Sequence, residues 1–183
     1  EMFPCGFYYG DLEGMAARSD EVIAWMSECA RQLGAGLAGS LPMRSGSGLA
    51  NTMVLTGVDG EIAARYEKVH LFPVTGEDRY FVAGNSVVTT LWQGVGVGLV
   101  ICFDLRFPEL TRRLCRREAL VLLVSAQWPL SRIENFRDLV CVRAMENQVF
   151  VAACNSCGED ADGMVLGGGS LVGSFQSADF EEP

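Results

Sequence analysis

The feature that most constrains the fold is a pair of apolar segments separated by one short helix signal. Residues 119–126, ALVLLVSA, form an unbroken apolar run, which is typical of a strand buried on both faces. The earlier run, residues 95–101, is rich in β-forming residues and ends directly before Cys102. Between the runs, Pro108 suits the first turn of a helix that we expect to end near Cys115. Strands with helices between them favour an α/β or α+β fold.

The rest of the pattern predicts further strands and helices along the chain. Asp59-Gly60 and Gln93-Gly94 lie between β-forming segments, and each indicates a hairpin turn. Helices are expected over residues 20–33 and 132–146, where apolar residues recur at helical spacing. The other expected elements are a loop over 1–10 and strands over 35–41, 86–92, 148–154 and 170–172. Because no internal repeat or linker is present, we expect one domain over residues 1–183.

The composition is that of a globular protein, and it argues against several classes of partner. Apolar residues make up 49% of the chain and charged residues 20%, so the chain is neither disordered nor fibrous. No run of about 18 apolar residues is present, so we expect no membrane association. The formal net charge of −9 disfavours nucleic acid, whose phosphates are bound by Lys and Arg. Seven cysteines do not form a fully paired disulfide framework, so a reducing, cytoplasmic location is expected.

Cys102 is the first candidate for chemistry, because its thiol lies where a buried strand gives way to a helix in the sequence ICFDLRFPEL. Backbone N–H groups and the positive end of a helix dipole at such a point favour the nucleophilic thiolate. A packed core cysteine is the alternative. The two charges that follow, Asp104 and Arg106, favour the functional interpretation, because a core strand rarely ends in charges that it does not need.

Four other ionisable residues could assist a nucleophile. His70 is the only histidine and could be the base of a Cys–His pair, or could be structural. Lys68 could be a solvated lysine, or an ammonium that stabilises a developing oxyanion. Glu1 and Glu77 could be surface carboxylates, or a general base and its supporting partner.

Two further motifs are too weak to predict a cofactor. GVGVG, residues 94–98, does not match the GxGxxG dinucleotide pattern and leads into a strand, not into a helix. CNSC, residues 154–157, is a single CxxC without a second pair at zinc spacing. We therefore expect no metal site and no organic cofactor.

Three segments, in order along the chain, resemble the nitrilase superfamily of carbon–nitrogen hydrolases. EMFPCGF resembles the segment that begins with the catalytic glutamate of the family, here Glu1. YEKVHLF resembles the lysine segment, here Lys68, and ICFDLRFPEL the cysteine segment, here Cys102. GEDRYFVAG, with Glu77 at the second glutamate, and VRAMENQVFVAACN are further matches. EMFPCGF, CFDLRFPE and SAQWPLSR are most similar to omega-amidases, which hydrolyse the terminal amide of 2-oxo acids.

The resemblance implies a four-layer αββα sandwich that forms a homodimer through helices next to the cysteine segment. It implies that Glu1, supported by Glu77, takes the proton of the Cys102 thiol, which attacks the amide of a small-molecule substrate. Lys68 and the backbone N–H of Phe103 then hold the oxyanion, ammonia leaves, and water cleaves the thioester. No metal or organic cofactor is implied.

The resemblance covers about residues 1–173 and is incomplete at both ends. The family has a strand that leads into the glutamate, whereas this chain begins with Glu1. The tail GSFQSADFEEP does not match the strand that the family has there. We therefore expect this sequence to be part of a longer enzyme, with a strand of about five or six residues upstream of Glu1.

Trp128 and Arg132 are the candidates for substrate binding. Both follow the strand over 119–126, whose C-terminal end is expected to border the pocket of Cys102. The Arg132 guanidinium could bind the carboxylate at the far end of a 2-oxo acid amide, or could be a surface arginine. Two alternatives remain open on the same residues. The chain could be a nitrilase or N-carbamoyl amidase, or an inactive relative that acts as a binding or assembly subunit.

Overall fold

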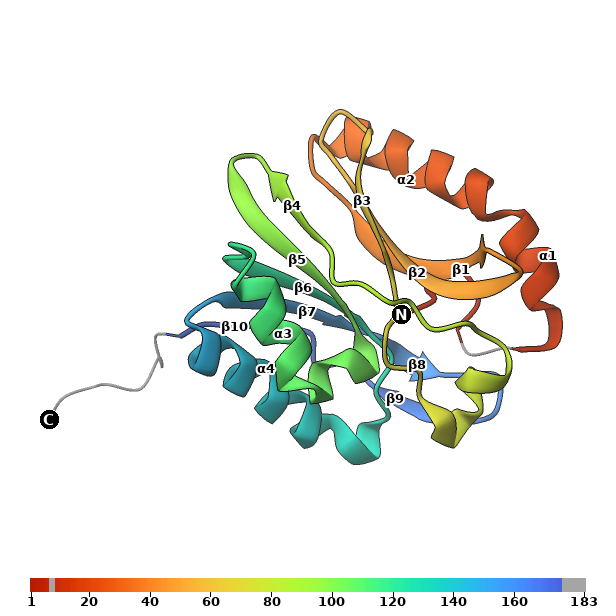
Figure 1. The fold of residues 1–183 in the computed structure, drawn as a ribbon. Coiled ribbons are helices and arrows are strands. Elements are labelled where there is room, and N and C mark those ends of the chain that lie inside the picture. The colour runs from red at the N-terminus through yellow and green to blue at the C-terminus, as the bar shows by residue number, and fades with distance from the viewer. Residues whose placement is uncertain (7–8, 176–183) are drawn as a thin grey trace, which may run out of the picture.

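The computed structural model describes residues 1–6 and 9–175. Two β-sheets stack face to face at its centre, and helices cover the outer side of each sheet, as Figure 1 shows. The predicted mixed α/β fold with four αββα layers is therefore confirmed.

The first sheet is a three-stranded antiparallel meander. Its strands, in spatial order, are β1 (Ala38–Ser45), β2 (Gly48–Thr56) and β3 (Ile62–Glu67). Helices α1 (Leu12–Ala17) and α2 (Ser19–Leu33) lie along its outer face. Ile23 and Met26 of α2 are buried against Leu41 and Val54 of the sheet, which fixes the helix on that face.

The second sheet has five strands in the order β10-β7-β6-β5-β4. The three inner strands, β5 (Val95–Ile101), β6 (Val121–Ala126) and β7 (Phe150–Asn155), are parallel. The edge strands, β4 (Thr89–Trp92) and β10 (Leu171–Gly173), are antiparallel to their neighbours. Helices α3 (Pro108–Cys115) and α4 (Ile133–Asn147) cover the outer face, so the inner strands are buried on both faces, as their apolar runs indicate.

Local sequence signals predicted the ends of several elements correctly. Helix α3 has the predicted bounds, and α2 ends at Gly34, which adopts a left-handed conformation with φ 60°. The Gln93-Gly94 turn joins β4 to β5 with φ 48° and 82°, the positive values that a type I′ hairpin turn requires. The strand predicted over 86–92 is β4, which begins three residues later, at Thr89.

Other elements have no such signal and were predicted wrongly or missed. The strand expected over 35–41 is β1, which begins at Ala38 and continues to Ser45. It runs through Pro42, which is accommodated because β1 is an edge strand. The short helix α1 and the ribbon of β8 (Cys157–Glu159) with β9 (Val165–Gly167) were missed. In the part of the chain that the structure describes, five short 3-10 helices were missed as well; they span Tyr9–Asp11, Pro73–Thr75, Glu77–Arg79, Cys102–Arg106 and Leu130–Arg132.

Within residues 1–6 and 9–175, none of the helices has the length and apolar character needed to cross a bilayer. All seven cysteines have free thiols.

The ends of three strands meet at one place between the sheets. Lys68 directly follows β3, Cys102 directly follows β5, and Gln127 directly follows β6. The backbone nitrogen of Glu1 donates a hydrogen bond to the carbonyl oxygen of Ala126, the last residue of β6, at 3.2 Å. The fold thus gathers side chains from separate parts of the chain at a common edge of the sandwich.

Candidate active site

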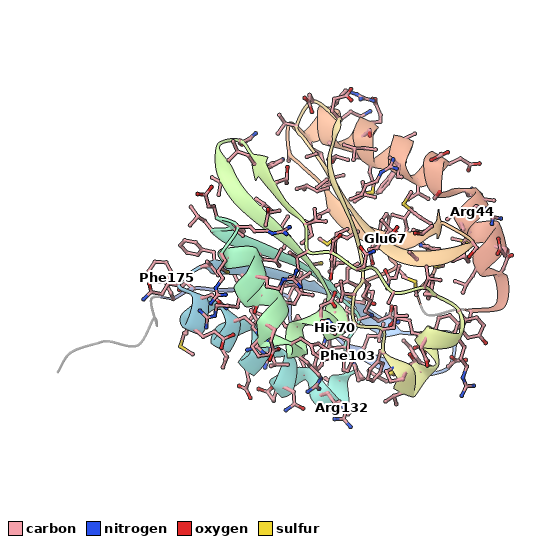
Figure 2. The ribbon with its side chains drawn as sticks, viewed as in Figure 1. Arg44, Glu67, His70, Phe103, Arg132 and Phe175 are labelled. Atoms are coloured by element: carbon pink, nitrogen blue, oxygen red, sulfur yellow. The ribbon has the colours of Figure 1, made fainter. Side chains whose placement is uncertain are left out.

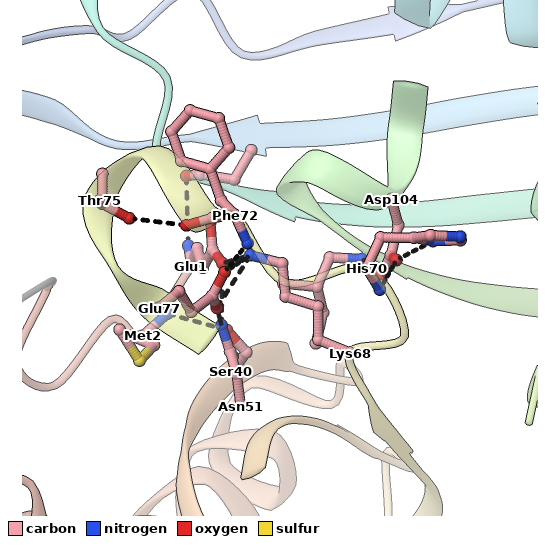
Figure 3. A network of polar contacts seen from close by, with 12 residues as sticks. Glu1, Met2, Ser40, Asn51, Lys68, His70, Phe72, Thr75, Glu77 and Asp104 are labelled. Atoms are coloured by element: carbon pink, nitrogen blue, oxygen red, sulfur yellow. Dashed lines mark hydrogen bonds and ion pairs between the residues drawn. The ribbon is translucent and has the colours of Figure 1, made fainter. Parts of the chain in front are cut away.

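Lys68 is held between two carboxylates in the interior. Its Nζ lies 2.5 Å from Oε1 of Glu1 and 2.8 Å and 3.0 Å from the two oxygens of Glu77. The side chains of all three residues are fully buried. Figure 3 shows the ammonium with both carboxylates converging on it. A buried ammonium with such partners stays charged, because removing one proton would leave two carboxylates uncompensated.

Asn51 and the Phe72 backbone complete the hydrogen bonding of this cluster. The Nδ2 atom of Asn51, on β2, donates to Oε1 of Glu1 at 2.8 Å and to Oε1 of Glu77 at 3.0 Å. The Phe72 N–H donates to Oε2 of Glu77 at 2.6 Å. Oε2 of Glu1 is buried and has no hydrogen-bond partner. That oxygen is therefore the part of the cluster that remains available to accept a proton.

The Cys102 thiol lies close to the Glu1 carboxylate. The residue is 9% exposed and begins the 3-10 helix Cys102–Arg106. Its φ of 43° is in the left-handed region, which a non-glycine residue adopts at a cost of about 1–3 kcal/mol. The surrounding structure holds the turn in this conformation, and the thiol comes within hydrogen-bonding range of Glu1 and of the Gln127 backbone N–H.

The pKa values in the cluster are shifted in directions that keep the thiol and the ammonium protonated. Burial, and then the charge of Glu1, raise the pKa of the Cys102 thiol well above its usual range, although Lys68 lowers it. Burial lowers the pKa of Lys68, but Glu1, Cys102 and Glu77 together outweigh it and raise that pKa above its usual value. Burial raises the pKa of Glu77, although Lys68 opposes the shift. In the resting site the thiol is neutral and needs a base in order to react.

A cavity of about 220 Å³ opens onto the thiol. Its lining is mostly apolar side chains from four segments of the chain, together with Lys68 and Cys102. The other lining residues are Phe72, Val74, Thr75, Phe103, Arg106, Gln127, Trp128, Pro129, Arg132 and Met164. A small-molecule site of this kind combines an apolar wall with a few polar groups that fix the orientation of the ligand.

The structure brings the predicted residues together to different degrees. Lys68 contacts both Glu1 and Glu77, and the Cys102 thiol lies close to Glu1. Phe103 lines the cavity, and as the second residue of its 3-10 helix its N–H has no acceptor within that helix. Trp128 and Arg132 line the cavity as well; Trp128 is buried, whereas Arg132 is exposed, at the outer edge of the molecule in Figure 2.

His70 does not pair with the nucleophile. Its ring stacks on Phe107, with centroids 3.6 Å apart, and its Nδ1 lies 2.9 Å from Oδ1 of Asp104. It is absent from the lining of the cavity. The alternative in which His70 is structural is therefore the one that the geometry favours.

Three residues at the site were not predicted from the sequence. Asn51 gave no signal, because an amide within a strand is as often structural as functional. Gln127 contributes its backbone N–H to the thiol. The guanidinium of Arg106 lies 4.7 Å from the centre of the Trp128 ring, a cation–π distance, and the indole nitrogen of Trp128 is buried without a partner. The charge of Arg106 after the apolar run was the one signal that could have revealed it.

Comparisons with known proteins identify the family of the chain. Residues 1–176 match the family described as carbon-nitrogen hydrolase. The 2-oxoglutaramate amidase of Bacillus subtilis (strain 168) is 35% identical over 176 residues, which cover 94% of this chain and 67% of that protein. Omega-amidase YafV of Escherichia coli (strain K12) is 36% identical over 172 residues, which cover 94% of this chain and 66% of that protein. The chain thus spans about two thirds of the length of these relatives.

A solved structure of this superfamily has the same fold as this chain. XC1258 from Xanthomonas campestris, described as a CN-hydrolase superfamily protein with an arsenic adduct in the active site, superposes with a TM-score of 0.88. The two sequences are 31% identical, and the superposition covers 96% of this chain and 68% of that one.

Proposed function

This chain belongs to the carbon–nitrogen hydrolase family, and we propose that its site hydrolyses a small linear amide through a thioester on Cys102. The observation that carries the proposal is the buried Lys68 ammonium between Glu1 and Glu77, with the Cys102 thiol, whose pKa is raised by burial, beside the Glu1 carboxylate. A general base, a nucleophile and an oxyanion-stabilising cation are the groups that amide cleavage needs.

In the first half of the reaction, Glu1 takes the thiol proton as the sulfur attacks the carbonyl carbon of the amide. The C–S bond forms, and the carbonyl oxygen becomes an oxyanion beside the Lys68 ammonium and the Phe103 N–H. The protonated Glu1 then gives its proton to the leaving nitrogen. The C–N bond breaks, ammonia departs, and an acyl thioester remains on Cys102.

In the second half, Glu1 removes a proton from a water molecule that attacks the thioester carbon. The same two donors stabilise the second oxyanion. When it collapses, the C–S bond breaks, the carboxylic acid is released and the thiol recovers its proton from Glu1. No redox step occurs, and the protein ends in its starting state.

For the substrate, we propose an amide whose far end carries a carboxylate, as in a 2-oxo acid omega-amide. The names of the relatives support this class, since two of them are a 2-oxoglutaramate amidase and an omega-amidase. Arg132 at the outer wall of the cavity is the proposed partner of that carboxylate. Trp128 is proposed to contact the part of the substrate between its amide and its carboxylate.

The experiment is an assay of ammonia release with purified protein. The panel contains 2-oxoglutaramate, a neutral amide of similar length, an aliphatic nitrile and an N-carbamoyl amino acid, each tested with the wild type and with Cys102→Ala. We expect release from the amides, fastest from 2-oxoglutaramate, and none with the variant. Turnover of the nitrile or the carbamoyl compound alone would move the chain to the alternative enzymes. An absence of turnover throughout would favour an inactive relative.

The Arg132 assignment has its own test. Because charge-assisted hydrogen bonds contribute about 1.5–3 kcal/mol, Arg132→Ala should raise KM for the anionic amide roughly 10- to 100-fold and leave the neutral amide unchanged. Arg137→Ala is the control, since Arg137 is an exposed arginine on α4 that pairs with Glu134. Equal effects of Arg132→Ala on both amides would remove Arg132 from the substrate site.

We also propose that the protein forms a homodimer through the helices next to the cysteine segment. Val142 and Met145 on α4 support this, because they are 40% and 48% exposed and would gain free energy when covered. Light scattering on the protein as it elutes from a size-exclusion column should give twice the mass of the chain. A monomer at micromolar concentration would contradict the proposal.

A further inference from the structure

Asp104 is a fully buried carboxylate that the chemistry above does not use. It lies two residues after Cys102 in the same 3-10 helix. Its Oδ2 accepts a hydrogen bond from the backbone N–H of Ile101 at 3.2 Å. Because Ile101 directly precedes Cys102 and Asp104 follows it, this bond spans the turn that contains the nucleophile.

The same carboxylate also binds the segment that carries the lysine. Oδ2 accepts from the Tyr66 hydroxyl at 2.7 Å. Oδ1 accepts from the His70 N–H at 2.9 Å and lies 2.9 Å from His70 Nδ1. Tyr66 and His70 are two residues before and two residues after Lys68. Figure 3 shows Asp104 and His70 beside Lys68.

The number of donors explains why the residue is an aspartate. With Nδ1 of His70 protonated, four donors converge on two oxygens, and an ionised carboxylate can accept four hydrogen bonds. An asparagine would accept at one oxygen only and would direct its own N–H groups at the donors from Ile101 and Tyr66. A charged acceptor is therefore matched to this position.

The conformation of Cys102 explains what the bonds hold. Its left-handed φ of 43° is unfavourable for a non-glycine residue and persists only where neighbouring contacts impose it. The thiol and the Lys68 ammonium must reach the same carbonyl group, yet they come from different sheets. The Asp104 side chain bonds to the backbone N–H of Ile101 on one side and to Tyr66 and His70 on the other, and it does not line the cavity.

We propose that Asp104 is a positioning residue that holds the Cys102 turn and the Lys68 segment in the relative position that attack on the amide requires. The proposal rests on the amidase function proposed above. It assigns to Asp104 the relative placement of nucleophile and oxyanion-stabilising cation, without contact with the substrate. Misplacement by about 1 Å can cost roughly 100-fold in rate.

The first test is Asp104→Asn, with kcat and KM measured separately on the preferred amide. We expect kcat to fall roughly 100-fold and KM to change less than 3-fold, because the cavity wall is unchanged. The control is Thr56→Val. It removes a buried oxygen that joins β2 to Leu37 at the hairpin end of the sheet, so it lowers stability without touching the Cys102 turn. A folded Asp104→Asn variant with wild-type kcat, or equal loss of kcat in both variants, would overturn the proposal.

A second variant keeps the test decisive if Asp104→Asn does not fold. Tyr66→Phe removes one of the four donors and adds no new group. We expect it to lower kcat roughly 3- to 10-fold at constant KM. In a folded double variant the two losses should not multiply, because both act through the same carboxylate. An unchanged kcat in Tyr66→Phe, or fully multiplicative losses, would count against Asp104 as the link.

A third measurement separates this inference from the proposed function. Alkylation of Cys102 by iodoacetamide, followed by peptide mass spectrometry, needs no turnover, and the exposed Cys157, which lies outside α4, serves as the internal reference. We expect at least 10-fold slower alkylation at Cys102 in Asp104→Asn and an unchanged rate at Cys157. If the wild type hydrolyses no amide, the proposed amidase function is wrong. The alkylation rate of Cys102 still tests whether Asp104 positions the nucleophile. An unchanged rate at Cys102 would refute the positioning role.

Discussion

At the scale of single residues, the cluster around Lys68 depends on balanced charge. The ammonium and both carboxylates have no exposed side-chain surface, so water does not solvate any of them. Transferring such groups from water is costly, and only close pairing with hydrogen bonds offsets the cost. Asn51 and the Phe72 N–H supply the remaining bonds. Lys68 is therefore expected to matter for both stability and catalysis.

The first prediction separates these two contributions. Lys68→Met should lower the free energy of unfolding by about 3–5 kcal/mol, because it leaves two buried carboxylates without a cation. It should also abolish ammonia release. The double variant Lys68→Met with Glu77→Gln removes one of those charges and should recover much of the stability but no activity. Denaturant titration and the ammonia assay measure the two effects. Recovery of activity in the double variant would exclude Lys68 from the reaction.

The second prediction concerns the nucleophile. Cys102→Ala should eliminate ammonia release and leave the thermal midpoint nearly unchanged, since alanine removes only the sulfur. Cys102→Ser should also be nearly inactive, because a hydroxyl ionises far less readily than a thiol at a site built around Glu1 and Lys68. Circular dichroism confirms folding of both variants. Wild-type turnover in Cys102→Ala would refute the thioester mechanism.

At the scale of elements, the site depends on how closely the strands approach their connections. Gly96 on β5 has no space for a side chain, because a Cβ atom there would lie 1.9 Å from the carbonyl oxygen of Glu118. The Leu120 N–H donates to the Gly96 carbonyl oxygen at 2.8 Å. The connection between α3 and β6 thus packs directly on the β5 backbone. This contact helps to place β5, which ends at the candidate nucleophile.

The third prediction compares two glycines of this strand. Gly96→Ala should destabilise the protein by 3 kcal/mol or more, about the upper end for overpacking, because the added methyl group meets backbone that cannot move aside. Gly98→Ala should cost less, since its nearest neighbours are the side chains of Leu122 and Leu114 at 2.9 Å and 3.2 Å. Urea midpoints of the two variants measure the difference. A larger loss in Gly98→Ala would contradict the packing argument.

At the scale of the whole molecule, folding changes the protonation of several buried groups in the same direction. The thiol of Cys102, the hydroxyl of Tyr66 and the ammonium of Lys68 all have pKa values above their ordinary 9.0, 10.0 and 10.5. Burial is the main cause of the raised pKa for the first two. For Lys68, burial lowers the pKa, but Glu1, Cys102 and Glu77 together outweigh it. The folded protein therefore keeps these protons at pH values where the unfolded chain releases them.

The fourth prediction follows from proton linkage. Where the folded state binds more protons than the unfolded state, stability falls as pH rises. The contribution of these groups is complete below about pH 9 and is lost progressively above it. Thermal midpoints measured from pH 7 to pH 11 should be flat at first and then decline. Tyr66→Phe cannot release a proton and should show a shallower decline. A midpoint that rises above pH 9 would contradict the pKa directions.

The sequence alone was sufficient for elements that have strong local signals. Pro108 marks the start of α3, Gln93-Gly94 supplies the φ values of a type I′ turn, and the unbroken run before Gln127 belongs to a strand covered on both faces. Such signals depend on residues close together in the chain. The order of the motifs was sufficient to identify the family, and through that resemblance to propose Glu1, Lys68 and Cys102 as a set.

Tertiary structure alone decided which groups meet and how they are bonded. Lys68 contacts Glu1 across 67 positions of sequence, and Asp104 bonds to Tyr66 across 38. These contacts arise because two sheets stack with their strand ends at one edge, and no local pattern contains that stacking. The same holds for Pro42, which is tolerated because β1 lies at the edge of its sheet. Periodicity predicts which face of an element is buried, but only the packing of distant elements determines the partner that it is buried against.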